Sequence, residues 1–123
     1  MQKDEFYDEA HRLIQRCFAI MEMADGEYAS AADKFANFKW QAEAEGRTPE
    51  QVAITFLLKH IRSLVRGISI REPMEGRICD IINYVLLIHG MRLEAERDTK
   101  TTVAEAVART TPIYVVGEPL SNA

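Results

Sequence analysis

The chain has 123 residues, of which 47% are hydrophobic and 28% are charged, and this composition is typical of one soluble globular domain with one core. Its net charge of -4 argues against a surface dominated by nucleic-acid phosphate binding. The charged N-terminus lacks the apolar run of a signal peptide, and no uncharged apolar stretch is long enough to span a membrane. We therefore expect a cytoplasmic protein.

The first 46 residues predict two helices. Residues 3–24 carry apolar side chains at three- and four-residue steps, which indicates an amphipathic helix. The stretch "DGEYASA" then interrupts the pattern with Gly26 and small polar residues. A second helix is expected over residues 32–45, and Gly46 is a suitable stop.

Two longer helices are expected next. Thr48, Pro49 and Gln51 form a capping-box start for a helix that should end at Gly67. Its expected core stripe consists of Ile54, Leu57, Leu58, Ile61, Leu64 and Val65. Pro73 should open a fourth helix that runs to about residue 96.

The C-terminal part is expected to differ from the rest. Thr102 and Glu105 predict a short helix over "VAEAVAR", and "PIYVV" is typical of an extended segment. That segment would pair with a partner chain, lie across the bundle, or form a tail. The expected class is therefore all-α: a four-helix bundle-like domain over residues 1–110, with a short C-terminal helix and an extended tail over 111–123.

The fourth helix is apolar nearly all round, so we expect it to be central and buried. Asp80 and Asn83 would then lie in a desolvated place, where a carboxylate needs a cation or several donors. One interpretation is a metal or polar ligand held by both side chains. The other is an internal salt bridge from Asp80 to a Lys or Arg, with Asn83 as a structural amide. Gly76, one turn earlier, could leave room for a ligand or a helix.

Basic side chains follow one side of the third helix. Lys59, Arg62 and Arg66 lie opposite its apolar stripe, and such a row suits phosphate or carboxylate groups. A solvated basic face is the alternative. Val52 and Phe56 on the same side as Lys59 favour a face that is partly covered.

The first loop offers two further candidates. Glu22 and Asp25, three apart at a helix end, could bind Mg²⁺ through oxygen ligands, although acidic residues around a surface turn are common. The stretch "YASAADKFANFKW" would either stack a planar ring such as a nucleobase or plug the end of the bundle. The two cysteines, Cys17 and Cys79, are expected as buried thiols in a reducing cytoplasm, with a disulfide as the alternative.

Three segments together resemble a helical domain associated with nucleotide modification in phages and bacteria. They are "DGEYASAADKFANFKWQAEAEG", "LLKHIRSLVR" and "EGRICDIINYVLLIHG". The loop departs from the family pattern, because Asp25 and Glu27 stand near its asparagine and aspartate and its lysine is absent. The residues that match the family motifs are Tyr28, Asn37, Phe38, Lys59, Arg62, Glu75, Asp80, Asn83 and Tyr84.

The resemblance implies a ligand that is a nucleotide or a nucleotide-like phosphate compound. Lys59 and Arg62 would engage phosphate, Asp80 with Asn83 would hold the ligand or Mg²⁺, and Tyr28, Phe38 and Trp40 would contact the base. Glu75 and Asp80 are the expected metal ligands. The family is similar to the MazG-like all-α nucleotide pyrophosphatases, yet this chain lacks their paired acidic helices, so turnover stays open.

A second class of function is a phage protein that sequesters a nucleotide signal without turnover, or that binds and inhibits a host protein. The acidic surface or "PIYVV" would then be the docking element. We expect a homodimer in either case, because small helical bundles often complete themselves by pairing.

Overall fold

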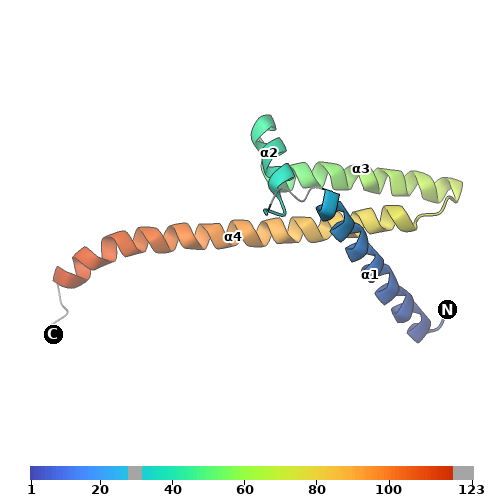
Figure 1. Cartoon of the computed structure of the whole chain (residues 1–123), viewed down its shortest axis with the longest axis horizontal. Coiled ribbons are helices and arrows are strands. Elements are labelled where there is room, and N and C mark those ends of the chain that lie inside the picture. Colours follow the sequence, from blue (N-terminus) through green and yellow to red (C-terminus); the bar gives the residue numbers. More distant parts are fainter. Residues whose placement is uncertain (28–31, 118–123) are drawn as a thin grey trace. The chain divides into compact units, whose positions relative to one another are not determined.

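The computed structural model describes residues 1–27 and 32–117, and at Glu27 and residues 111–117 it describes the backbone alone. This described part holds four α-helices and no strand (Figure 1). It confirms the predicted all-α, bundle-like class. The helices are α1 (Lys3–Glu27), α2 (Ala36–Glu45), α3 (Pro49–Ile70) and α4 (Glu75–Gly117).

The chain divides into two compact units, Met1–Met91 and Arg92–Ala123, and the boundary falls inside α4. In the first unit, α3 lies alongside the first part of α4, and α1 crosses that same part of α4 (Figure 1). α2 packs against α3. In the second unit, the described residues continue α4. None of the described helices is both long and apolar enough to cross a membrane.

Two turn signals read from the sequence are confirmed. α2 ends at Gly46, whose φ of 65° is left-handed and whose N–H donates to the carbonyls of Ala42 and Glu43. α3 begins with the full capping box: the Gln51 N–H donates to the Thr48 hydroxyl, and the Thr48 N–H donates to the Gln51 side chain. Local sequence decides both features, because only neighbouring residues take part.

Other helix boundaries differ from the prediction. α2 begins at Ala36 rather than at residue 32, because Asp33 accepts the Phe35 N–H and holds a turn before the helix. α3 continues through Gly67 and ends at Ile70. Gly67 is buried, and a Cβ there would lie 2.6 Å from the Met74 side chain. This glycine therefore serves close packing of the α3–α4 turn rather than helix termination.

The predicted short helix and the extended tail are wrong for residues 102–117, which continue α4 without a break. Residues 91–111 contain neither glycine nor proline, so no residue type forces the helix to stop. Thr102, predicted as a cap, instead donates its hydroxyl to the Asp98 carbonyl at 2.9 Å, as threonines within helices do. Residues 118–123 of the predicted tail lie outside the described residues.

The buried core is small and does not include the stripe predicted for α3. Of that stripe Leu57 and Leu64 are half-buried, whereas Ile54, Leu58, Ile61 and Val65 are exposed and Val52 and Ala53 are fully buried instead. α3 therefore packs on its own chain through a different face from the one that its largest aliphatic residues predict. The fully or nearly fully buried apolar side chains are Cys17, Ala42, Val52, Ala53, Cys79 and Met91.

Candidate functional site

Aromatic rings from three helices meet in the first unit. The Phe38 ring of α2 lies edge-on to Phe56 of α3 and to Tyr84 of α4, with centroids 6.4 and 6.3 Å apart. Tyr84 stacks on Phe56 at 6.0 Å and on the imidazole of His60 at 5.2 Å. We call these four residues, together with Asp80, the α3–α4 cluster. The four rings are half-buried, so the cluster joins three helices and still reaches the surface.

The Asp80 carboxylate belongs to this cluster. Its Oδ2 lies 3.5 Å from His60 Nδ1, and its side chain is 44% exposed. The desolvated environment expected for Asp80 is therefore not present, and its recorded charge partner is a histidine rather than a Lys or Arg. Burial raises the pKa of the Tyr84 phenol, and the nearby negative charge of Asp80 raises it further. The phenol consequently stays protonated and can donate a hydrogen bond.

Asn83 contacts α1 rather than α3. Its side chain is buried, and its Nδ2 donates to the Cys17 carbonyl of α1 at 3.0 Å. Its Oδ1 has no donor among the described residues. The Asn83 amide therefore joins α4 to α1 by a hydrogen bond. The Asp80 carboxylate instead lies beside His60 of α3.

Glu75, expected as a second metal ligand, forms ion pairs with Arg12 and Arg16 of α1. Two guanidinium groups already neutralise this carboxylate. The described part of the chain contains no group of three or more His, Cys, Asp or Glu side chains arranged to hold a metal ion. Near the end of α1, Asp25 pairs with Lys34 at 2.5 Å. Of the acidic residues expected to bind Mg²⁺, Asp25 and Glu75 thus belong to two separate sets of ion pairs.

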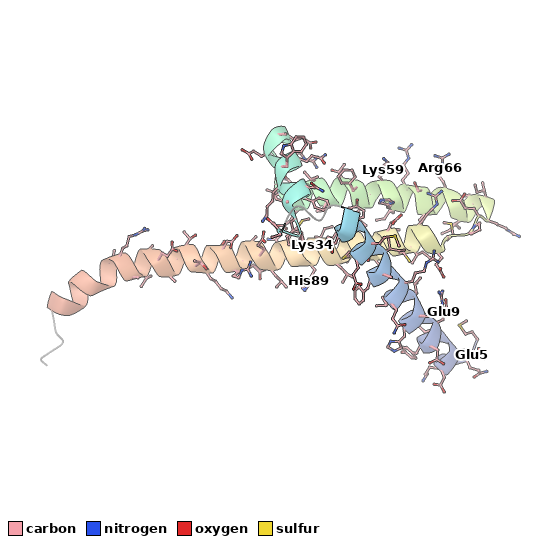
Figure 2. The ribbon with its side chains drawn as sticks, in the orientation of Figure 1. Glu5, Glu9, Lys34, Lys59, Arg66 and His89 are labelled. Atoms are coloured by element: carbon pink, nitrogen blue, oxygen red, sulfur yellow. The ribbon has the colours of Figure 1, made fainter. Side chains whose placement is uncertain are left out.

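The basic residues of α3 are exposed. Lys59 and Arg66 extend from α3 on the side away from α4 (Figure 2). Arg62 is exposed as well, and no ion pair joins these three cations to the described side chains. They flank the α3–α4 cluster in sequence, since Lys59 precedes His60 directly, but they do not line its ring stack.

The remaining predicted residues lie apart from one another. Asn37 is exposed on α2, next to Phe38. Trp40 is 75% exposed and makes no ring contact in the cluster. Tyr28 lies outside the described residues. Of the residues expected to bind a ligand, the structure therefore brings together Phe38, Asp80 and Tyr84.

His60 is the cluster residue that the sequence analysis missed. His60 has no zinc-ligand spacing to another histidine or to a cysteine, so no metal motif marks it in the sequence. The available signal was the i,i+4 spacing of Phe56 with His60 and of Asp80 with Tyr84, which puts each pair on one face of its helix. Two such faces on consecutive helices can meet when those helices lie side by side.

The cluster combines a carboxylate, an imidazole and a phenol with three aromatic faces. Such an arrangement can hold a planar ligand by stacking and fix its polar edge by hydrogen bonds. Comparison with protein-family models, with curated proteins and with solved structures found no match to this chain.

Proposed function

We propose that this chain is a phage-type helical module that binds a nucleotide or a nucleotide-like phosphate ligand at the α3–α4 cluster. The observation that supports this most directly is the Asp80–His60 pair beside the Tyr84–Phe56 ring stack. Aromatic faces bind bases with little dependence on sequence, and a carboxylate can accept hydrogen bonds from a base or a ribose. Phe38, which lies edge-on to both rings of that stack, would contact the base from the side of α2.

Phosphate recognition would come from the exposed cations of α3. Lys59, which directly precedes His60, would add a positive charge beside the cluster, and Arg62 would grip phosphate oxygens that extend past the cluster to the outer side of α3. Hydrolysis of a nucleoside triphosphate is the enzymatic form of this proposal. Asp80 would then be the residue that holds Mg²⁺, which would neutralise charge on the phosphates, because Glu75 is engaged by Arg12 and Arg16.

A protein-interaction module is the second candidate, and the exposed apolar residues favour it. Phe6, Phe18 and Trp40 are 56%, 46% and 75% exposed, and exposed aromatic side chains are available for contacts with another protein. In this form the protein would bind and inhibit a host protein, whereas sequestering a nucleotide signal without turnover is the non-enzymatic form of the ligand proposal. Both forms suit the cytoplasm, where the free thiols Cys17 and Cys79 stay reduced.

A thermal-shift screen against nucleotides, their deoxy forms and cyclic dinucleotides, each with and without Mg²⁺, tests the proposal. A ligand at 100 times its dissociation constant stabilises the fold by about 2.7 kcal/mol, which raises the melting temperature by several degrees. A shift that needs Mg²⁺ supports the enzymatic form and leads to a phosphate-release assay. Flat curves across the whole panel contradict ligand binding and favour the interaction module.

Variants then locate the site by calorimetric titration of the ligand found in the screen. Asp80→Asn and Arg62→Ala should each weaken binding by about tenfold or more, the usual effect of removing one charge-assisted contact. Lys3→Ala is the matched control, because Lys3 is an exposed cation at the start of α1. Equal binding by all three variants would place the ligand elsewhere.

A further inference from the structure

α3 leaves a row of five aliphatic side chains open to solvent. Ile54, Leu58, Ile61, Val65 and Ile68 are 42%, 60%, 38%, 59% and 64% exposed. They follow one another at steps of four, three, four and three residues. This is the heptad spacing by which one α-helix packs along another helix. We call these five residues the α3 row.

The α3 row lies on a different face from the one that packs within the chain. Ala53, His60 and Gly67 repeat at seven-residue steps on the inner face, where Ala53 and Gly67 are buried and His60 meets Asp80 of α4. α3 thus packs on its own chain through the face that carries Ala53, His60 and Gly67 and leaves the five side chains of the α3 row outside. A continuous row of this kind differs from the scattered apolar residues that any surface carries.

We propose that a second copy of this chain covers the α3 row, with the two α3 helices antiparallel about a two-fold axis at Ile61. The α3 row is self-complementary when the two α3 helices run antiparallel. Ile54 comes to lie opposite the partner's Ile68, and Leu58 opposite the partner's Val65. Each position therefore meets an aliphatic side chain of similar size, as an isologous interface requires.

Charge complementarity selects the antiparallel direction. Glu50 lies in the first turn of α3 and Arg71 is the cap residue directly after its end, so the two charges lie at opposite ends of the α3 row, three heptads apart. Antiparallel pairing places Glu50 opposite the partner's Arg71, and the symmetry repeats this pair at the other end. Parallel pairing instead places Glu50 opposite the partner's Thr55, which carries no charge, so Glu50 would gain no ion pair.

Arg62 flanks the α3 row next to the proposed axis. Antiparallel pairing brings the two Arg62 side chains toward each other, and like charges repel. Salt screens this repulsion. We therefore expect Arg62→Gln to tighten the dimer in low salt, and this effect should fade as the salt concentration rises.

Sedimentation equilibrium of the full chain over a range of concentrations tests the proposal. We expect a dimer for the native chain and a monomer for Leu58→Glu, because two carboxylates would then enter an apolar seam. Val103→Glu is the matched control, since Val103 is a 58% exposed aliphatic residue of the second unit and not part of the α3 row, and this variant should stay dimeric. Far-ultraviolet circular dichroism verifies that each variant is folded. A native monomer, or a dimer that survives Leu58→Glu in a folded protein, overturns the proposal.

A charge exchange tests the direction of the helices. Glu50→Arg alone should weaken the dimer about tenfold, because it places like charges at both ends of the seam. The double variant Glu50→Arg with Arg71→Glu should restore the native dissociation constant. If the double variant is weaker than the single variant, the antiparallel pairing is wrong. Both results are independent of nucleotide binding, so they distinguish this proposal from the ligand proposal.

Discussion

The side-chain amide of Asn83 donates a hydrogen bond to the carbonyl oxygen of Cys17, 3.0 Å away, where α4 and α1 cross. Asn83 is 8% exposed, and Cys17 is completely buried. Cys79, one turn before Asn83, is completely buried too, and its burial raises the pKa of its thiol. A hydrogen bond in such a dry contact orients the two helices, because neither group has water as an alternative partner.

Replacing Asn83 should therefore lower stability more than replacing an exposed asparagine. Asn83→Ala leaves the packed contact without its hydrogen bond, and we expect a loss of about 1–3 kcal/mol in the free energy of unfolding. Urea denaturation measures this loss. Asn37→Ala is the control, because Asn37 is exposed on α2, and it should change stability by less than about 0.5 kcal/mol. Unchanged stability in Asn83→Ala, together with lost ligand binding, would assign Asn83 to the ligand instead.

Glu75 should matter little to Mg²⁺. Its pairs with Arg12 and Arg16 lie at the surface, where each of the three side chains is 36–49% exposed. Surface pairs contribute up to about 1 kcal/mol, so Glu75→Gln should lower stability only slightly. Any Mg²⁺-dependent thermal shift should persist in Glu75→Gln and disappear in Asp80→Asn. The reverse pattern would place the ion at the start of α4.

Two glycines of α4 should respond in opposite ways to alanine. A Cβ at Gly90 would lie 2.8 Å from the tip of the Phe35 ring, whereas a Cβ at Gly76 would meet nothing within 4 Å. Gly76→Ala should stabilise by about 0.5–1 kcal/mol, because alanine favours the helix. Gly90→Ala should instead lower the melting temperature, since overpacking costs about 1–3 kcal/mol. An increase of the melting temperature in both variants would show that Phe35 moves aside freely.

Tyr84 should contribute to stability below alkaline pH. Its pKa is raised from the ordinary value of 10.0, first by burial and then by Asp80. A group whose pKa is higher in the folded than in the unfolded state stabilises the fold below its unfolded pKa, and the benefit is lost as pH rises through the folded pKa. Stability should therefore fall as pH rises above about 10. Tyr84→Phe should reduce the slope of stability against pH in that range, which denaturation series at several pH values measure.

The sequence predicted features that depend on neighbouring residues. The capping box of Thr48 and Gln51 and the left-handed stop at Gly46 are present, because a few adjacent backbone groups decide each of them. The all-α class follows equally from local periodicity. The break predicted at Thr102 was wrong, since a threonine can also donate back within a continuing helix.

The sequence by itself determined that four amphipathic or apolar helices form, and approximately where three of them begin and end. Only the tertiary structure decided which faces meet. Periodicity shows that Ile54, Leu58 and Ile61 share a face, but it does not show what covers that face. α3 packs on its own chain through Ala53 and Gly67 instead. The contact between Asp80 and His60 likewise depends on the tertiary structure, because it requires that α3 and α4 pack side by side with these two faces turned toward each other.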